Sequence, residues 1–284
     1  MVGKDGSENM QINGKTKVYG IIGNPVSHSL SPLMHNQAFA ACDENRVYVP
    51  LLTDDLQAAL HGMREMHIEG ASVTIPYKEQ VLGLLDDVDP VAEKIGAVNT
   101  VVVRRGGQSA SLFGTNTDWL GSNKALLNHI ELPGSRAVIL GAGGAARAIG
   151  FGLIEAGAGV EIKSRSESKG RRLADQLECL WSPLDEKPEQ AAEILINATS
   201  VGMEPDNEVS PIDQSLLDGY RVIMDIVYAP LQTRLLRDGA ARGCACVNGL
   251  EMLLYQGVAQ FELWTGREAP VEVMRQTLLG AVNR

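Results

Sequence analysis

The sequence predicts an α/β protein of two units, and three observations lead to that class. The chain has 284 residues, which corresponds to about two domains at ~150 residues each. Its hydrophobic fraction of 44% and charged fraction of 21% are typical of a globular chain that buries a large core. Short apolar runs also alternate with helical stretches, as they do when helices connect the strands of a sheet.

Charge and cysteine content limit the partners. A formal net charge of −10, from 25 Lys and Arg against 35 Asp and Glu, argues against duplex nucleic acid, which needs a basic surface. No apolar run reaches ~18 residues, so we expect no membrane span. Cys42, Cys179, Cys244 and Cys246 show no zinc or disulfide pattern. We therefore expect free thiols, a cytoplasmic protein and a small-molecule partner.

The first half alternates β-branched runs with helical patterns. We expect strands at 17–22, 47–52, 70–75 and 98–104, and helices at 31–40, 56–66, 78–85, 90–95 and 119–129. Ser31 and Pro32 suit the N-cap and the first position of the first helix. Pro76 should end the third strand, and Gly106-Gly107 predicts a hairpin turn. Residues 1–9 are polar, and we expect them to form a disordered extension.

The pattern of apolar residues changes from Arg136 onward. The run at 137–140 is wholly apolar, which is typical of a parallel strand buried on both faces. Further strands are expected at 160–162, 194–197, 221–225 and 246–248, with helices ending at Ala156 and spanning 169–177, 251–265 and 271–282. This alternation predicts a doubly wound parallel sheet followed by a helical tail.

A glycine loop lies between the apolar strand and the next helix. In Gly141-x-Gly143-x-x-Ala146, the first glycine permits a tight turn and the second lets the backbone approach a pyrophosphate. Ala146 then allows the helix to pack closely on the sheet, and the helix N-terminus attracts phosphates. The pattern predicts a dinucleotide site; the alternative is an ordinary glycine-rich turn.

The end of the next strand decides which dinucleotide we expect. An NAD site places a carboxylate about 20 residues after the glycine loop. Here the strand ends in Lys163-Ser164-Arg165-Ser166, and Lys169 follows soon after. Basic side chains at this point suit a 2′-phosphate, so the sequence favours NADP. The alternative is a set of solvated surface charges.

Four polar stretches interrupt the first half, at 27–32, 72–78, 97–100 and 116–118. Each lies at or just after a predicted strand, where open α/β sheets bind ligands. Their hydroxyls and amides suit a polyhydroxylated small molecule, and Ser29 with Ser31 could hold a carboxylate. Lys78 and Asp118 are the residues suited to proton transfer. Taken singly, each hydroxyl could instead be a cap or turn contact. His28 and His35 lack companion metal ligands, so we expect no metal site.

With these motifs in order, the sequence resembles the shikimate dehydrogenase family over nearly its whole length. The motifs are GNPVSHSLSPLMHN from Gly23, VTIPYK from Val73, GAVNT from Gly96, GTNTD from Gly114, GAGGAARA from Gly141, NATSVGM from Asn197, DIVYAP from Asp225 and GLEMLLYQ from Gly249. The resemblance implies an enzyme that reduces 3-dehydroshikimate to shikimate with NADPH, for aromatic amino-acid biosynthesis. It also implies a substrate domain with a mixed sheet, formed by 10–117 and 249–284, and an inserted Rossmann-like NADP domain at 118–248.

The resemblance further implies a role for individual residues. Lys78 and Asp118 would be the catalytic pair. The substrate would be bound through its carboxylate by Ser29 and Ser31 with Tyr228 nearby, and through its ring hydroxyls by Thr74, Lys78, Asn99, Asp118 and Gln256. The cofactor would contact Gly141, Gly143, Gly144 and Ala145 with its phosphates, Ser164, Arg165, Ser166 and Lys169 with its 2′-phosphate, and Thr199, Gly249 and Met252 near its nicotinamide.

Two departures from the family pattern stand out. Ser72 replaces the usual Asn before Val73-Thr74, and Ser164-Arg165-Ser166 replaces the usual Asn-Arg-Thr. The first leaves open a quinate/shikimate dehydrogenase of broader range, because quinate carries one more hydroxyl. A nucleotide-sensing protein on the same fold is the non-enzyme alternative, although a sensor needs no proton-transfer pair. The family includes monomers and homodimers.

The chemistry expected of Lys78 follows from its neighbour. A lysine is ordinarily charged at neutral pH, and a nearby carboxylate favours that charged form. We therefore hypothesise that Lys78 acts as a charged acid and hydrogen-bond donor oriented by Asp118, rather than as a neutral base. In carbonyl reduction it would give its proton to the new hydroxyl.

Overall fold

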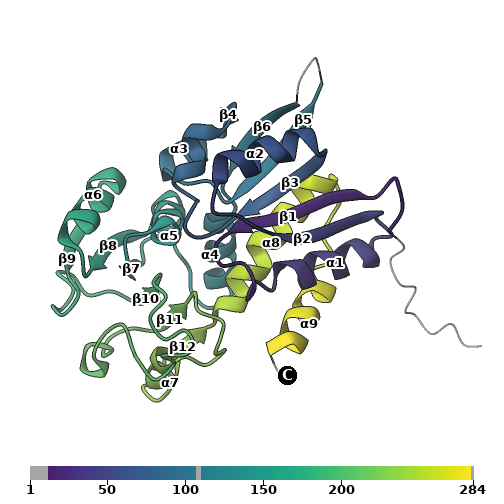
Figure 1. Ribbon diagram of the computed structural model, residues 1–284. Coiled ribbons are helices and arrows are strands. Elements are labelled where there is room, and N and C mark those ends of the chain that lie inside the picture. Colours follow the sequence, from purple (N-terminus) through teal and green to yellow (C-terminus); the bar gives the residue numbers. More distant parts are fainter. Residues whose placement is uncertain (1–11, 107–109, 283–284) are drawn as a thin grey trace, which may run out of the picture.

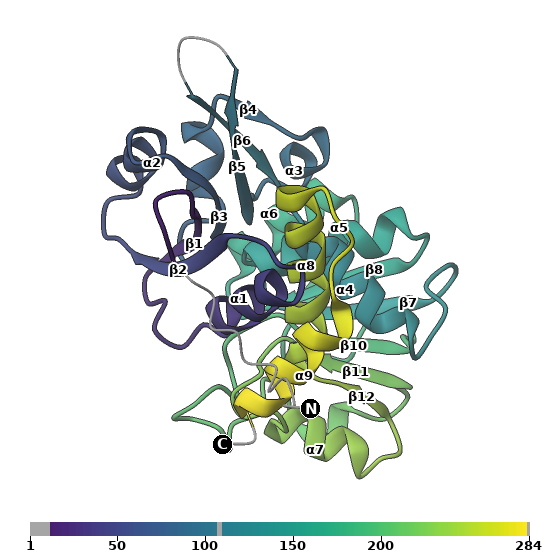
Figure 2. The same cartoon turned by 90° about the vertical axis from the view of Figure 1, so that its right-hand side faces the viewer.

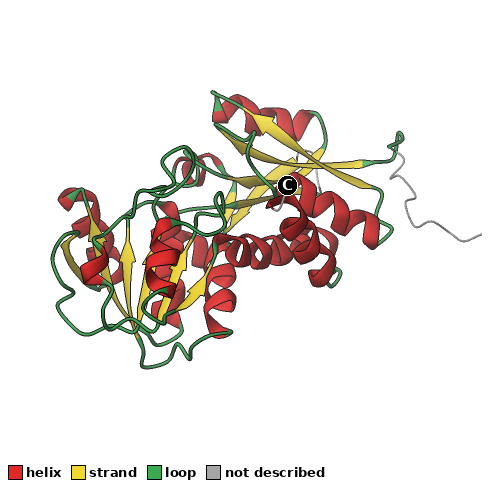
Figure 3. Cartoon of the chain, turned by 90° about the horizontal axis from the view of Figure 1, so that it is seen from below, coloured by secondary structure: helices red, strands yellow, loops and turns green. Residues whose placement is uncertain are grey.

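The computed structural model describes residues 12–106 and 110–282, and it contains two six-stranded sheets with helices packed around each (Figure 1). Seen from below, helices fill the space between the two sheets (Figure 3). The expected two-unit α/β architecture is thereby confirmed. The expected extension at 1–9 lies outside the described residues. None of the helices described is long and apolar enough to cross a membrane.

The first sheet is mixed and has the strand order β2-β1-β3-β5-β6-β4. Its strands are β1 (Lys17–Gly23), β2 (Arg46–Leu52), β3 (Ile68–Val73), β4 (Asp87–Val88), β5 (Thr100–Arg105) and β6 (Ala110–Thr115). Strand β1 runs parallel to β2 and β3, whereas β5 runs antiparallel to β3 and β6. The antiparallel β5–β6 pair is the expected hairpin, although residues 107–109 of its turn lie outside the description.

Helices cover both faces of the first sheet. One face carries α1 (Ser31–Ala41), α8 (Gly249–Thr265) and α9 (Val271–Val282), and the other carries α2 (Leu56–Glu65). The 3-10 helix η1 (Gln80–Leu84) and α3 (Pro90–Ile95) follow β3. In Figure 2 the two last helices lie beside α1, and α1 contacts both. The end of the chain therefore completes the core begun by its first strands.

The second sheet is wholly parallel, with the order β12-β11-β10-β7-β8-β9. Its strands are β7 (Arg136–Leu140), β8 (Gly159–Ser164), β9 (Leu180–Pro183), β10 (Ile194–Asn197), β11 (Val222–Asp225) and β12 (Ala245–Val247). In β7, Ala137 and Ile139 pack on one layer while Val138 and Leu140 pack on the other. This double burial explains why the run is apolar throughout.

Two layers of helices flank the second sheet. One layer consists of α4 (Asp118–Leu127), α5 (Gly144–Glu155) and α6 (Glu167–Leu177), with part of α8. The opposite layer contains α7 (Arg234–Ala240) and the segment around the 3-10 helix η2 (Gln214–Leu216). Helix α4 packs against both α5 and α8, so it joins the helices of the two sheets.

Several local expectations need correction. Ser31 is not the N-cap of α1; Leu30 occupies that position, and Pro32 is the second helical residue. Strand β3 ends at Val73 rather than Ile75, because the N–H of Tyr77 bonds to the carbonyl of Thr74 and turns the chain. The helix expected at 78–85 is a shorter 3-10 turn. Strands β4 and β9 and helices η2 and α7 were not predicted, since each has seven residues or fewer and shows little periodicity.

His35 is a polar residue in the core of the first unit. It is fully buried and stacks on Tyr48 with ring centroids 4.6 Å apart, while Trp264 packs at 5.3 Å. Neither ring nitrogen has a partner within ordinary hydrogen-bond geometry among the described residues, although the Gln260 side chain lies close enough to oppose part of the pKa shift. Burial lowers the pKa of His35 to about 3, because a charged imidazole would lose its hydration there.

This buried imidazole should make the fold less stable in acid. The unfolded chain takes up a proton near pH ~6.5, whereas folded His35 resists it down to about 3, so stability is lost as pH falls below neutral. We expect the stability advantage of the wild type over His35→Met to shrink by about 2 kcal/mol between pH 7 and pH 5. Urea unfolding at both pH values measures it. The exposed His129→Gln should show no such change, and an equal change would contradict the assignment.

Candidate active site

A lysine and a carboxylate meet where the first sheet faces the helices between the units. The Nζ atom of Lys78 lies 2.6 Å from Oδ2 of Asp118. The Asp118 residue is 4% exposed, while the Lys78 side chain keeps 19% exposure. Lys78 follows β3, and Asp118 is the first residue of α4. The pair thus combines a buried anion with an amine that a ligand can reach.

Asn99 holds the second oxygen of this carboxylate. Its Nδ2 donates to Asp118 Oδ1 at 2.8 Å, and its Oδ1 accepts the Thr117 backbone N–H at 2.8 Å. Because a backbone N–H can only donate, this contact fixes which end of the amide faces Asp118. Asn116 accepts the N–H of Asp118 at 2.9 Å. The motifs at 97–100 and 116–118 therefore fold together to position one carboxylate.

The residues predicted to bind the carboxylate of a substrate form a second cluster. The backbone N–H of Ser31 donates to Ser29 Oγ at 3.3 Å, and Ser31 is 4% exposed. Tyr228, which follows β11, reaches the backbone of Leu30. Burial raises the pKa of Tyr228, and the Leu30 contact partly opposes that rise. Segments nearly 200 residues apart in sequence thus meet at these two serines.

Thr74 and Gln256 border the same region. Thr74 is partly exposed, and a Cβ added at Gly23 would lie 2.3 Å from its methyl group. Gln256 is 7% exposed and donates to the Leu253 carbonyl of its own helix at 2.8 Å. Gly121 allows α4 to approach α8 here, because a Cβ would lie 2.8 Å from the Gln256 nitrogen.

The glycine loop adjoins the lysine. Gly141 has a φ of 122°, which an L side chain rarely adopts, and an added Cβ would lie 3.0 Å from the Ala198 carbonyl oxygen. Gly143 caps α5 without any side-chain cap, so its first N–H groups are available to an anion. A Cβ added at Gly144 would lie 3.3 Å from Lys78 Cβ. The loop that suits a pyrophosphate is thus in contact with the lysine.

Basic side chains follow β8 as expected, with one correction. Arg165 and Lys169 are exposed, and neither forms an ion pair with any described residue. Lys163, in contrast, is 2% exposed and donates to Ser182 Oγ at 2.6 Å and to two backbone carbonyls. It therefore cannot contribute to the basic surface predicted there, since its charge is used to tie β8 to β9.

Two serines shape the same turn. Ser164 is 7% exposed; its hydroxyl donates to the Ser166 carbonyl at 2.9 Å and accepts Trp181 Nε1 at 3.0 Å. Ser166 is exposed at the start of α6. The Ser164 hydroxyl is thus directed inward, while Ser166 stands beside the two free cations.

Strands β10 and β11 end in a shared polar contact. Asn197 Nδ2 donates to Asp225 Oδ1 at 2.9 Å, and Thr233 Oγ1 donates to the other oxygen at 2.7 Å. Burial raises the pKa of Asp225 to about 6, although these bonds partly oppose the rise. Asn197 Oδ1 also accepts the Thr199 hydroxyl at 2.7 Å. This places Thr199 beside Gly141, whose added Cβ would lie 3.1 Å from the threonine methyl.

Ala145 lies in the first turn of α5, and the last two residues of the predicted cofactor set lie on α8. Gly249 packs against the loop after β11, where a Cβ would lie 2.3 Å from the Ile226 carbonyl oxygen. Met252 is 6% exposed and belongs to the core of the second unit. Helix α8 therefore contributes to both cores, since its Leu254 and Phe261 belong to the first.

The two units also meet through charges that the sequence did not predict. Arg147 of α5 is 3% exposed, and its Nη2 lies 3.5 Å from Glu79 Oε2. Arg172 approaches the same carboxylate at 3.8 Å. Glu79 adjoins Lys78 in sequence, so it links the lysine segment to the helices of the second unit. The glycine-loop motif contains Arg147, but nothing in its spacing identified Glu79 as the partner.

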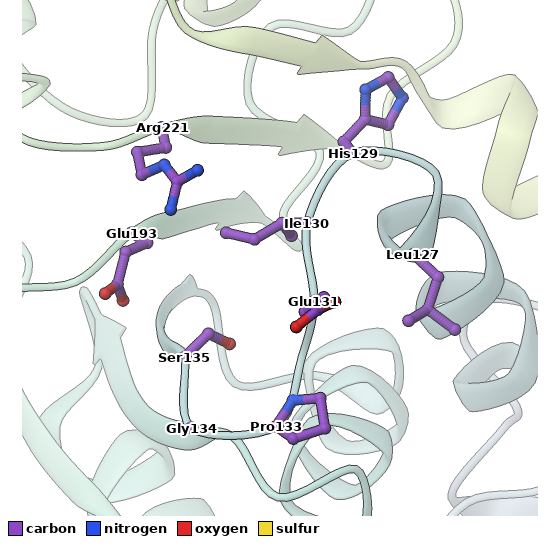
Figure 4. Close-up of a pocket in the computed structure, with 9 residues that line it drawn as sticks. All are labelled: Leu127, His129, Ile130, Glu131, Pro133, Gly134, Ser135, Glu193 and Arg221. Carbon is purple, nitrogen blue, oxygen red and sulfur yellow. The ribbon is translucent and has the colours of Figure 1, made fainter.

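A cavity of about 530 Å³ lies elsewhere, at the amino ends of the parallel strands (Figure 4). Its lining consists of Leu127, His129, Ile130, Glu131, Pro133, Gly134, Ser135, Glu193 and Arg221. Glu193 accepts the Arg136 N–H at 2.9 Å. Ligands of open α/β sheets bind at the opposite, carboxyl ends, so this cavity is separate from the Lys78–Asp118 site. No group of three or more metal-ligating side chains occurs in the described part of the chain.

A parallel sheet with a glycine loop, set against a second α/β unit that supplies a lysine–carboxylate pair, defines a two-domain nicotinamide-dependent oxidoreductase. The chain matches the shikimate dehydrogenase substrate binding domain over residues 21–101 and the shikimate 5′-dehydrogenase C-terminal domain over 249–279. It is 45% identical to the NADP(+) shikimate dehydrogenase of Pyrococcus furiosus, covering 94% of this chain and 97% of that one. The chain belongs to the shikimate dehydrogenase family.

Solved structures agree with this assignment. A shikimate dehydrogenase in complex with NADP+ superposes with a TM-score of 0.92 at 37% identity, covering 98% of this chain and all of that one. The enzyme of Thermus thermophilus, in complex with NADP(H) and shikimate, has a TM-score of 0.84 at 39% identity, covering 93% and 99%. The inserted Rossmann-like fold expected from the resemblance is confirmed.

Removal of the Arg165 guanidinium should weaken the binding of NADP much more than that of NAD. Arg165→Ala should raise the KM for NADP at least about tenfold and leave that for NAD nearly unchanged, because only NADP presents a 2′-phosphate to the guanidinium. Steady-state kinetics with each cofactor measure it. Arg171→Ala, which removes a nearby exposed arginine that pairs with Glu167, is the control. Equal losses for both cofactors would refute a 2′-phosphate role for Arg165.

Proposed function

We propose that this protein catalyses the reversible reduction of 3-dehydroshikimate to shikimate with NADPH. The observation that carries the proposal is the Lys78–Asp118 pair at 2.6 Å, held against the first turn of the glycine-loop helix through Gly144. The residues suited to proton transfer therefore lie next to the loop suited to bind a dinucleotide. The relatives with this name cover almost the full chain, which supports the same activity here.

We propose that residues 10–117 and 249–284 form the substrate domain and that 118–248 form the NADP domain. The two sheets and the return of α8 and α9 to α1 support this division. NADP would rest on Gly141, Gly143, Gly144 and Ala145, with its 2′-phosphate near Arg165, Ser166 and Lys169. The uncapped start of α5 and the two free cations fit those groups. Ser164 would support this turn, while Thr199, Gly249 and Met252 would border the nicotinamide.

The substrate would lie across the two polar clusters. Ser29 and Ser31, with Tyr228, would bind its carboxylate, because hydroxyl groups can donate to both oxygens. Thr74, Asn99 and Gln256 would contact the ring hydroxyls beside Lys78 and Asp118. Asn99 already gives both amide hydrogens to Thr117 and Asp118, so its contact with substrate requires a hydroxyl that donates or a local rearrangement.

The residues of the chain would supply the proton. NADPH held by the glycine loop would supply a hydride to the carbonyl carbon. As negative charge develops on the carbonyl oxygen, Lys78 Nζ donates a proton to it and an alcohol results. Asp118 stabilises the charged amine and fixes its direction, since both of its oxygens are engaged. Lys78 recovers its proton from solvent, to which its side chain is partly exposed.

We also propose that the working environment is the reducing cytoplasm, which suits the four free thiols. The principal partner would be the small-molecule substrate rather than a nucleic acid or membrane. A monomer or a homodimer remains the prediction for the assembly.

A cofactor-by-substrate matrix tests the proposed function. Shikimate or quinate is oxidised with NADP+ or NAD+, and reduced nicotinamide is followed by absorbance. We expect the highest kcat/KM with shikimate and NADP+. Preference for quinate with NAD+ would replace the proposal by a broader quinate/shikimate dehydrogenase. Nucleotide binding without turnover of any substrate would support a sensor on the same fold.

Loss of either member of the pair should affect kcat much more than cofactor binding. Lys78→Met removes the proton donor, and Asp118→Asn removes the charge that orients it; each should lower kcat by about 10²–10⁴. Stopped-flow and steady-state kinetics, with NADP+ affinity from fluorescence titration, give both quantities. Lys94→Met, on α3, is the matched control. Near-normal kcat in Lys78→Met would exclude the acid role.

A further inference from the structure

A buried chain of hydrogen bonds begins at the carboxylate of Asp118 and continues into the core of the first unit. Thr100 Oγ1 donates to Asn99 Oδ1 at 2.7 Å, and Gln260 Nε2 donates to Thr100 Oγ1 at 2.9 Å. Gln260 lies on α8 and is fully buried. It is one turn after Gln256, on the same face of the helix. None of the motifs that identified the site includes it.

The chain continues from Gln260 to the serine cluster. Ser72 Oγ donates to Gln260 Oε1 at 2.9 Å, and Tyr48 Oη donates to Ser72 Oγ at 2.6 Å. Ser31 lies close enough to the Tyr48 hydroxyl to influence its pKa. Ser72 is the residue that departs from the family pattern, and here it occupies the middle of the network. The two polar clusters of the site are therefore connected inside the protein.

The direction of every bond in this chain is determined. Gln260 Nε2 also faces the backbone carbonyl of Asn99 at 3.4 Å, and a carbonyl can only accept. Its Oε1 must then face Ser72, which spends its one hydrogen on that oxygen and can only accept from Tyr48. At the far end, Asn99 is fixed by the Thr117 N–H. Reversal of one member would leave a buried polar atom without a partner, which is costly.

We propose that Gln260, with Ser72, is a positioning residue that acts through Thr100 to hold the Asn99 amide in the orientation selected by the Thr117 N–H, and so keeps the Lys78–Asp118 pair set for proton transfer. The proposal rests on the proposed function. Gln260 touches neither the lysine nor the carboxylate; it acts through Thr100 and Asn99. Because the same network ends at Tyr48 beside Ser31, the carboxylate-binding serines and the proton-transfer pair share one rigid frame.

Two substitutions separate this role from simple packing. Gln260→Met keeps the length of the side chain and removes both polar ends, so we expect kcat for shikimate to fall about tenfold or more, which is ~1.4 kcal/mol, with KM changed less than about threefold. Phe261→Leu, a fully buried neighbour on α8, is the packing control. An equal loss of kcat in Phe261→Leu, or none in Gln260→Met, would overturn the proposal.

Ser72→Ala tests whether the two residues act through one chain. If they do, the Ser72→Ala/Gln260→Met double variant should have a kcat close to that of the worse single variant, since residues of one network are not additive. If the fold-loss of kcat in the double variant equals the product of the two single losses, the residues act independently, and a shared frame is contradicted.

Gln260→Glu tests the proposal through the pH dependence of kcat, which a change in packing alone would not alter. A protonated carboxyl can donate to Thr100 as the amide does, whereas the ionised form cannot, so kcat relative to wild type should fall as pH rises. The titratable groups facing this position are His35 of α1 and Tyr48 of β2, with Asp118 and Lys78 beyond Asn99. In the wild type, burial lowers the pKa of His35 to about 3 and raises that of Tyr48, so neither group contributes to the wild-type profile near neutral pH. A pH-independent ratio would contradict the proposal.

A measurement without substrate keeps this inference distinct from the proposed function. Hydrogen exchange of the Asn99 side-chain amide, followed by ¹⁵N NMR, should be about tenfold faster in Gln260→Met than in wild type and in Phe261→Leu. If the wild type does not oxidise shikimate, the proposed function fails while the exchange rates still decide the role of Gln260. Unchanged exchange in Gln260→Met would overturn it.

Discussion

A buried carboxylate needs compensation for the water it has lost, and much of this molecule is arranged to provide it for Asp118. One oxygen faces Lys78 and the other faces Asn99, while the backbone N–H of Asp118 is held by Asn116. These groups come from three separate loops at the strand ends of the first sheet. Helix α4 starts at Asp118 itself, so the placement of this one group ties the first sheet to the helices that lead into the second.

The sequence predicted more of the site than of its support. Strand–helix alternation, the glycine loop and the polar stretches at 27–32, 72–78, 97–100 and 116–118 were visible because each carries a local pattern. Tyr48, Gln260 and Glu79 were not, because their roles depend on contacts between distant segments. Lys163 shows the converse: by position it belonged to a basic surface, yet the later strand β9 buries it and takes up its hydrogen bonds. The spacing of residues within one segment does not predict which distant segment will contact it.

The departures from the family pattern can now be interpreted physically. The replacement of the usual Asn by Ser72 left open a broader substrate range. The short side chain of Ser72 joins Tyr48 to Gln260 inside the core, behind the surface where a ligand would lie. Ser164 similarly turns inward to Trp181 and leaves the exposed part of its turn to Arg165 and Ser166. At both positions the serine hydroxyl forms a hydrogen bond inside the protein and is not directed toward a ligand.

The position of α8 has a consequence for how the chain is made on the ribosome. Phe261 and Leu254 complete the core against Tyr19 and Phe39, which are synthesised more than two hundred residues earlier. While the middle of the chain emerges, α1 alone covers that apolar face of the first sheet. The strands of the parallel sheet follow one another in the sequence, whereas the core of the first unit needs the last two helices. The part of the chain that is synthesised first can therefore complete its core only after the last helices have been made.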